Sequence, residues 1–254
     1  MRDLTYPPII TAAKTGFRIL GQRFTMTGTE RVPRSGGVLL AFNHVSYLDF
    51  IYGGLAAHPS RRLVRFMAKR EVFDHPVGGP VMRSMHHIAV DRGEGIGSFH
   101  AAVDNLRAGE AVGIFPEATI SRALELKDFK TGAVRIAAEA GVPVLPVILW
   151  GTQRIFTKDH PRDFSRGKTI AISVGEPLHP EGTDPVAETA VLHAAMSDLL
   201  DHTIAAYPSA EQPPGSWWLP ARHGGSAPTL EEAQRLDDAE RRDRAERRAA
   251  RRSS

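Results

Sequence analysis

The amino-acid sequence predicts an α/β fold in which helices flank a mainly parallel sheet. From residue 36 onward, short continuous apolar runs alternate with segments of helical periodicity. Continuous apolar runs are typical of strands buried on both faces, and the intervening helices are typical of crossovers between parallel strands. The 254 residues are enough for one such domain with additional segments at its ends.

The predicted domain occupies residues 31–208. We expect strands at residues 38–42, 63–68, 87–90, 111–115, 144–150 and 169–174. We expect helices at residues 47–57, 98–108, 131–140 and 187–206. In such a sheet ligands bind at the carboxyl ends of the strands, so the residues that follow each apolar run are the first candidates for a site.

Residues 1–30 are predicted to be an amphipathic helix and its lead-in to the domain. Apolar side chains between Ile9 and Phe24 recur at spacings of three and four residues, with cationic residues between them. Pro7 and Pro8 fit the first turn of a helix. Such a helix either packs on the core or lies in a membrane interface, and the segment alone does not decide between the two.

The last two segments differ from the domain in composition. Residues 209–228 are rich in Pro and Gly, and Trp217, Trp218 and Leu219 are expected to anchor them to the domain. Residues 229–254 form a charged tail, with eight Arg and seven acidic residues between 229 and 252. We expect this tail to be disordered or helical, because it has no apolar face to bury, and its Arg residues suit anionic lipid headgroups.

Composition excludes several classes of protein. The chain contains no Cys, which rules out thiol catalysis, zinc sites built on Cys, and disulfides. It has neither an apolar run of about 18 residues nor a secretory signal pattern, so we expect a cytoplasmic protein without a transmembrane helix. The net charge is a modest +3, and the basic residues at the C-terminus lie in a mixed-charge tail without interleaved aromatic residues, so nucleic acid is not an expected partner.

A histidine and an aspartate follow the first predicted strand of the domain. His44 leaves the strand, and Asp49 lies five residues on, where the next helix begins. A carboxylate that accepts the proton of one imidazole nitrogen leaves the other nitrogen basic and able to take a proton from a substrate hydroxyl. The pair therefore predicts general-base chemistry, although the spacing alone also fits a purely structural pair.

Four blocks of the sequence resemble, in order and separation, those of the glycerolipid acyltransferase superfamily, whose best-known members are the 1-acylglycerol-3-phosphate acyltransferases. The first is Asn43-His44-x-Ser46-x-x-Asp49, which is similar to the family's Asn-His-x-Ser-x-x-Asp. The others are His87–Arg92, which ends in Asp-Arg, Phe115–Arg122, and Val142–Val147. Lys69-Arg70-Glu71 also resembles the family's Lys-x-Glu.

The resemblance implies the glycerol-3-phosphate acyltransferase fold and transfer of an acyl chain from acyl-CoA or acyl carrier protein to the free hydroxyl of a lysophospholipid. The acceptor it implies first is 1-acylglycerol-3-phosphate, in phospholipid biosynthesis, at the inner face of the cell membrane. No cofactor is implied beyond the thioester co-substrate. His44 would be the general base and Asp49 its orienting partner. The implied substrate-binding residues are Asn43, Ser46, Lys69, Arg92, Glu117, Thr119, Ser121 and Arg122.

The Phe115–Arg122 block departs from the family pattern at two positions. Ala118 stands where the family has Gly, which predicts that this turn does not require a positive φ. Ile120 stands where the family has an Arg that resembles a phosphate ligand. Three explanations remain open: Arg122 takes over this role, other cations such as Lys69, Arg70, Arg92 or Lys130 suffice, or the acceptor carries a different headgroup.

Two other interpretations follow from the same residues. A membrane-binding protein that keeps the fold but has impaired catalysis would account for Ile120, whereas the intact His44 and Asp49 argue against it. His86 and His87 with Asp91 could suggest a metal site. Adjacent residues of a strand point to opposite faces, so we do not expect metal there.

Overall fold

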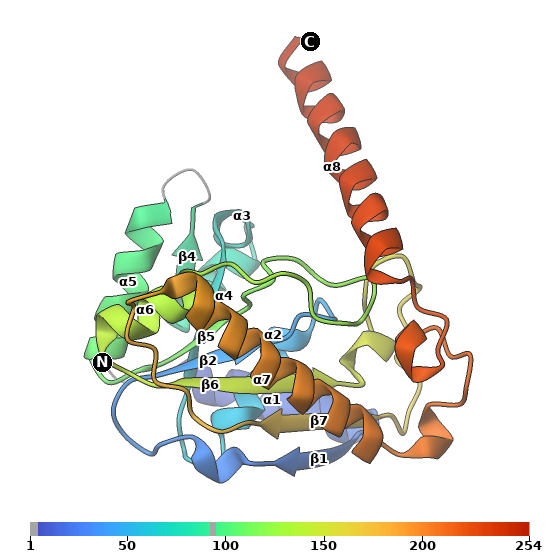
Figure 1. Cartoon of the computed structure of the whole chain (residues 1–254), viewed down its shortest axis with the longest axis horizontal. Helices are drawn as coiled ribbons and strands as arrows, with labels where there is room; N and C mark the ends of the chain where they lie inside the picture. Colours follow the sequence, from blue (N-terminus) through green and yellow to red (C-terminus); the bar gives the residue numbers. More distant parts are fainter. Residues whose placement is uncertain (1–4, 92–94, 254) are drawn as a thin grey trace.

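The computed structural model of the chain describes residues 5–91 and 95–253, which form one seven-stranded sheet with helices on both faces (Figure 1). The strands are β1 (Arg23–Thr27), β2 (Val38–Phe42), β3 (Val64–Lys69), β4 (Ile88–Val90), β5 (Ala111–Ile114), β6 (Val144–Trp150) and β7 (Thr169–Val174). Their order in the sheet is β1-β7-β6-β2-β5-β3-β4, and every neighbouring pair is parallel except β6 and β7. The predicted mainly parallel α/β fold is therefore confirmed.

Eight α-helices and five short 3-10 helices are present among the described residues. The α-helices are α1 (Tyr6–Ile19), α2 (Asp49–Gly53), α3 (Arg70–Phe73), α4 (Gly78–Ser84), α5 (Gly95–Arg107), α6 (Gly132–Ala140), α7 (Pro185–Ala206) and α8 (Leu230–Ser253). The 3-10 helices are η1 (Thr29–Arg31), η2 (Gly54–Ala57), η3 (Thr152–Arg154), η4 (Ser209–Glu211) and η5 (Ala221–His223). None of the helices in the described ranges is both long and apolar enough to cross a membrane.

The central strand β2 is buried on both faces because helices cover each side of the sheet. Leu39 and Ala41 pack in one apolar cluster with side chains from α5, α6 and α7. Val38, Leu40 and Phe42 pack in a second cluster with side chains from α1, α2 and η2. All five residues of β2 are buried, which explains why its sequence is continuously apolar rather than alternating.

The strand order places the carboxyl ends of three strands next to one another. β2 lies between β5 and β6 and is parallel to both, so the carboxyl ends of these three strands share one edge of the sheet. The chain adds β3, β4 and β5 on one side of β2 and then crosses to add β6 on the other, and ligands of open α/β sheets bind where the strand order reverses in this way. Residues that follow the three strands can therefore converge there.

The N-terminal segment departs from the expected periodic helix. Helix α1 ends at Ile19, Gly21 adopts φ +56°, and Phe24 lies in edge strand β1, which the periodicity did not predict. The apolar periodicity continues past the end of α1 because Phe24 packs against Phe17 of the helix, with ring centroids 5.3 Å apart.

Helix α1 packs two aromatic side chains against the domain. Tyr6 and Phe17 are buried, and the Tyr6 hydroxyl donates to the carbonyl oxygen of Val64 in β3 at 2.7 Å. The exposed positions of α1 are Pro7, Pro8, Thr11, Ala12, Thr15, Arg18 and Ile19, of which Ile19 is 63% exposed. The helix packs on the core through Tyr6 and Phe17, and its contact with a membrane interface stays a prediction.

The C-terminal segments have defined positions in the fold. In the Pro/Gly-rich stretch, Leu219 is buried and the indole N–H of Trp218 donates to the carbonyl oxygen of Glu211 at 3.1 Å. The following helix, α8, contacts the body through its first turns, and its C-terminal half projects away from the domain (Figure 1). Of the two states expected for the tail, the structure shows the helical one.

Candidate active site

Asn43, the first residue after β2, pairs with β6 through its side-chain amide in place of its backbone. The Asn43 side-chain amide donates to the carbonyl oxygen of Leu149 at 3.0 Å and accepts from the Leu149 N–H at 2.7 Å. Strand β6 is longer than β2, so the amide side chain continues the pairing while the backbone turns away. Asn43 is buried and its side chain pairs with β6, while its predicted contact with substrate stays a prediction.

The turn after Asn43 is organised around the carboxylate of Asp49. Its Oδ2 accepts the backbone N–H groups of Val45 and Ser46, each at 2.7 Å, and lies 3.0 Å from Nδ1 of His44. Its Oδ1 accepts the hydroxyl of Thr152 at 2.7 Å. Asp49 is fully buried, and these four donors compensate its removal from water.

This geometry sets the chemical state of the His44 ring. Because Oδ2 of Asp49 already accepts two backbone N–H groups, the ring tautomer that fits this contact carries its proton on Nδ1 and leaves a lone pair on Nε2. The ring packs against Phe115 with centroids 4.4 Å apart, which limits its rotation. The His44 side chain is 22% exposed, so the imidazole is accessible at the strand ends.

Glu117 holds the turn after β5 against the turn after β2. One carboxyl oxygen accepts the backbone N–H of His44 at 2.8 Å, and the other accepts the backbone N–H of Lys127 at 3.1 Å. Burial raises the pKa of Glu117 to about 8, although both hydrogen bonds act in the opposite direction. Glu117 is buried and positions the backbone of His44, and its contact with substrate stays a prediction.

The Ala118 prediction is wrong. Ala118 adopts φ +60°, so the turn does use the left-handed conformation for which the family has Gly. The alanine accepts this conformation because the turn is closed by its own N–H, which donates to the carbonyl oxygen of Phe115 at 3.0 Å. An L-residue in this region costs about 1–2 kcal/mol.

The rest of the Phe115–Arg122 block is divided between the core and the surface. Ile120, at the position of the family's Arg, is buried and contributes to packing. Ser121 is also buried, and its backbone N–H donates to the carbonyl oxygen of His44 at 2.8 Å. Thr119 is half-buried, and its hydroxyl accepts from Nζ of Lys127 at 2.8 Å.

The remaining predicted substrate residues have different surroundings. Ser46 is buried and donates to the carbonyl oxygen of Phe156 at 2.7 Å, so it supports the turn. Lys69 is half-buried at the end of β3. Arg122 forms ion pairs with Asp159, and with two carboxylates of α8. Arg92 lies outside the described residues.

His87, the residue before β4, accepts a backbone hydrogen bond inside the protein. The ring Nδ1 of His87 accepts the backbone N–H of Phe66 at 3.0 Å, and burial lowers the pKa of His87 to about 4. No group of three potential metal ligands was found among residues 5–91 and 95–253.

Three further residues at the site did not emerge from the sequence. Thr152 supplies the hydroxyl that completes the shell of Asp49, and it follows β6 after Gly151. Lys127 and Lys158 join Arg122 in a group of cations near the turn after β5. No local motif marks them, because their significance depends on which loops meet at the edge of the sheet.

Comparison with known proteins agrees with the fold and the site. A family profile described as Acyltransferase matches residues 23–150, just over half of the chain, so the chain belongs to the Acyltransferase family. This confirms the predicted family and its O-acyltransferase class.

Several proteins that are similar to this chain are named as 1-acyl-sn-glycerol-3-phosphate acyltransferases. The chain is 32% identical over 151 residues to a 1-acyl-sn-glycerol-3-phosphate acyltransferase of Bacillus subtilis, a match covering 59% of this chain and 71% of the relative. It is 30% identical over 168 residues to the enzyme so named in Borreliella burgdorferi, covering 63% of this chain and 64% of the relative. The crystal structure of the 1-acyl-sn-glycerophosphate (LPA) acyltransferase PlsC from Thermotoga maritima shares the fold, with a TM-score of 0.66, 80% coverage of each chain and 23% identity.

Replacing Ala118 by Gly should stabilise the protein. The substitution Ala118→Gly relieves the cost of φ +60°, but it adds conformational entropy to the unfolded chain, so we expect a net gain of about 0.5–1 kcal/mol. Urea denaturation measures the free energy of unfolding. The control Ala12→Gly, at an exposed position in α1, should instead lose up to about 1 kcal/mol. Equal losses in the two variants would contradict the assignment of strain at Ala118.

The buried Glu117 should make stability depend on pH. Between about pH 4.5 and 8 the folded protein keeps a proton that the unfolded carboxyl releases, so a rise in pH favours unfolding. From pH 6.5 to 8, the wild type should lose about 1.5 kcal/mol more unfolding free energy than Glu117→Gln does. Denaturation curves at several pH values measure this difference, and parallel pH profiles would argue against a raised pKa.

Proposed function

We propose that this protein transfers an acyl chain from acyl-CoA or acyl carrier protein to the free hydroxyl of a lysophospholipid, with 1-acylglycerol-3-phosphate as its acceptor. The observation that carries the proposal is the His44–Asp49 pair at the strand ends. Its 3.0 Å contact leaves the second imidazole nitrogen basic on an accessible ring.

In the proposed reaction, His44 Nε2 takes the proton from the acceptor hydroxyl as its oxygen forms a bond to the thioester carbonyl carbon. The tetrahedral intermediate then expels the thiolate, which receives the proton from the His44 imidazolium. Asp49 stabilises the imidazolium without taking its proton, since its carboxylate remains hydrogen-bonded to four donors. The thioester is already activated, so the step calls for no covalent enzyme intermediate.

The identity of the acceptor is supported by the names of the relatives and by nearby positive charge. Arg122, Lys127 and Lys158 lie on loops at the same edge of the sheet as His44. A phosphomonoester carries about −1.5 to −2 charge at pH 7 and offers three strong acceptor oxygens. Because Ile120 supplies no charge, a lysophospholipid with another headgroup is the alternative acceptor.

The proposed substrates place the enzyme at a lipid surface, which we take to be the inner face of the cell membrane in phospholipid biosynthesis. The support comes from α2 and the turn before it, where Tyr47, Phe50 and Ile51 are exposed within seven residues of His44. Exposed aromatic and aliphatic side chains beside a site are suited to the interface of a bilayer.

The proposed function is tested by acyl transfer to a panel of lysophospholipids. The wild-type protein should prefer lysophosphatidic acid over lysophosphatidylglycerol, lysophosphatidylinositol and lysophosphatidylethanolamine. The variant His44→Ala should fold normally by circular dichroism and lose about 10²–10⁴-fold in kcat. The control His202→Ala, at an exposed position on α7, should retain activity. Wild-type turnover by His44→Ala would remove the proposed mechanism, and preference for another headgroup would establish the alternative acceptor.

Membrane binding is tested by sedimentation with anionic liposomes. We expect the double variant Phe50→Asp and Ile51→Asp to pellet several-fold less than the wild type, because two apolar side chains near the site become charged. The matched control is Val191→Asp, which places a charge at an exposed position on α7, across the sheet from α2. Equal pelleting of all three proteins would show that α2 does not meet the membrane.

A further inference from the structure

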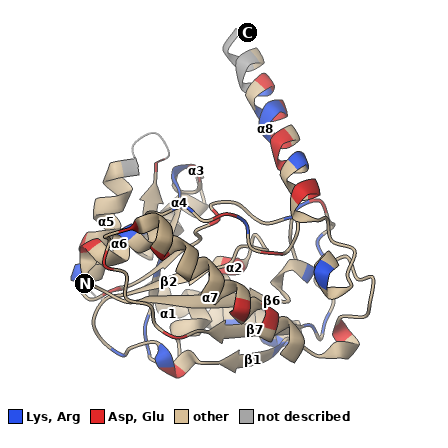
Figure 2. Cartoon of the chain, viewed as in Figure 1, with Lys and Arg blue, Asp and Glu red and all other residues tan. Residues whose placement is uncertain are grey.

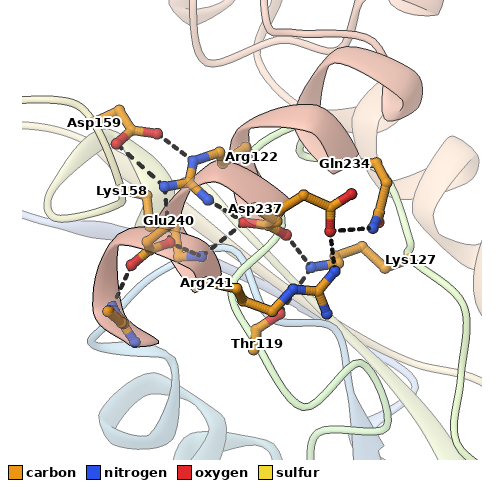
Figure 3. A network of polar contacts seen from close by, with 11 residues as sticks. Thr119, Arg122, Lys127, Lys158, Asp159, Gln234, Asp237, Glu240 and Arg241 are labelled. Atoms are coloured by element: carbon orange, nitrogen blue, oxygen red, sulfur yellow. Dashed lines mark hydrogen bonds and ion pairs between the residues drawn. The ribbon is translucent and has the colours of Figure 1, made fainter. Parts of the chain in front are cut away.

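The cations beside the candidate active site are occupied by carboxylates from the C-terminal helix (Figure 3). Asp237 of α8 contacts Arg122 and Lys127, and its Oδ1 lies 3.0 Å from Nζ of Lys158. Glu240, one turn further along α8, lies 3.0 Å from the Arg122 guanidinium and 3.3 Å from Nζ of Lys158. We call Arg122, Lys127 and Lys158 the cation cluster.

The cation cluster is connected directly to the catalytic turn. The backbone N–H of Lys127 and that of His44 donate to opposite oxygens of the same Glu117 carboxyl group. Ser121, which precedes Arg122, donates its backbone N–H to the carbonyl oxygen of His44 at 2.8 Å. A group bound by the cluster would therefore lie against the loops that hold the imidazole.

The cation cluster is largely removed from water. The Arg122 side chain is 8% exposed, and the side chains of Lys127, Lys158 and Asp237 are also mostly buried. Burial acts to raise the pKa of Asp237, but hydrogen bonds from Lys127 and Lys158 outweigh it and lower this pKa. Asp237 is therefore present as a carboxylate, which is the charge state that resembles a phosphate oxygen.

Helix α8 is held by charge rather than by an apolar face. Among the α8 residues whose burial the structure describes, Ala233 and Asp237 are buried, while Leu230 and Leu236 are about half exposed. Residues 241–247 are all exposed, and Figure 2 shows basic and acidic residues interspersed along the projecting part of the helix. Attachment of this kind gives up little apolar burial when it is released, and it weakens in the presence of a competing anion.

Helix α8 also has the means to remain helical when it leaves the body. Its start carries a capping box in which Thr229 and Glu232 exchange hydrogen bonds, with Glu232 Oε2 accepting the Thr229 N–H at 2.9 Å. Along its length, Arg244 pairs with Glu240 and Arg247 pairs with Asp243, four residues apart. Release therefore does not require the helix to unfold.

The charges balance for a phosphate in place of α8. The cation cluster carries +3, and Asp159, Asp237 and Glu240 together carry −3. Without the two carboxylates of α8, the cation cluster and Asp159 together keep a charge of +2, which matches a phosphomonoester of about −1.5 to −2. A cavity of about 210 Å³ adjoins this point, and it is lined by Arg122 and Lys158 together with the apolar Leu124, Trp217 and Leu236.

We propose that the cation cluster is the subsite for the phosphate group of the acceptor, and that Asp237 and Glu240 of α8 occupy it until the acceptor displaces them. The inference rests on the proposed function for the identity of the acceptor. The phosphate of the lysolipid and the two carboxylates compete for the same donors, so α8 lowers the apparent affinity for phosphorylated acceptors. An acceptor without phosphate has no group to exchange for α8.

The kinetic test compares charge removal on two faces of the same helix. Asp237→Asn with Glu240→Gln should lower KM for lysophosphatidic acid about 3–10-fold, because the competing carboxylates are gone. The matched control, Asp238→Asn with Glu246→Gln, changes a half-buried and an exposed carboxylate of α8 that do not contact the cation cluster, and it should leave KM unchanged. Arg122→Gln should raise KM for lysophosphatidic acid about 10-fold or more. Equal KM values in the first variant, the control and the wild type would overturn the proposal.

A structural test works without turnover and therefore separates this inference from the proposed function. Because the chain contains no Cys, spin labels can be placed at Val191→Cys on α7 and Glu246→Cys on α8 alone. In neutral detergent micelles, lysophosphatidic acid should shift the distance distribution between the labels, and monoacylglycerol should not.

The third arm of this measurement uses inorganic phosphate. A shift with the lysolipid alone assigns the subsite to a lipid phosphate, and a shift with both assigns it to phosphate of either source. No shift with either ligand overturns the proposal even if acyl transfer is observed. A shift in a protein that transfers no acyl chain would retain the subsite and reject the proposed function.

Discussion

The organisation of the site depends on the buried carboxylate of Asp49. A carboxylate in the protein interior is costly unless its oxygens are hydrogen-bonded, and Asp49 receives two backbone N–H groups, one hydroxyl and the His44 ring. The path of the turn and the orientation of the imidazole are therefore consequences of one requirement. If the ring is turned away, Asp49 loses a donor, so the imidazole is held in place by the same bonds that hold the loop.

The same logic applies to the residues around this pair. Asn43 replaces the backbone in the pairing with β6, and Glu117 joins the turns after β2 and β5 through the N–H groups of His44 and Lys127. These side chains serve polar groups of the backbone that a strand leaves unpaired where it ends. Asn43 and Glu117 lie close to His44 because a side chain can reach unpaired backbone groups only from a few residues away or from a neighbouring strand.

Ion pairs hold helix α8 against the loops beside the candidate active site. Helix α8 has no broad apolar face, yet it lies against the domain because Asp237 and Glu240 neutralise cations that few other groups in the described structure reach. Such an ion pair fixes the orientation of the helix, but its net contribution to the free energy of folding is modest because both ions lose their hydration. It differs from the packing of α7, whose Leu192, Met196 and Leu200 are part of the core. The tail is thus positioned by the chemistry of the site.

The sequence by itself determined the strands β2, β6 and β7, whose continuous apolar runs reflect burial on both faces, and the pairing of His44 with Asp49, which a single turn brings together. The positive φ of Ala118 followed from the closure of a turn, and the residue type alone pointed the other way. Only the tertiary structure brought Asp237 to Arg122, 115 residues away in the chain. A sequence shows that a residue is charged, whereas the fold decides which charge it meets, because that depends on the loops gathered at one edge of the sheet.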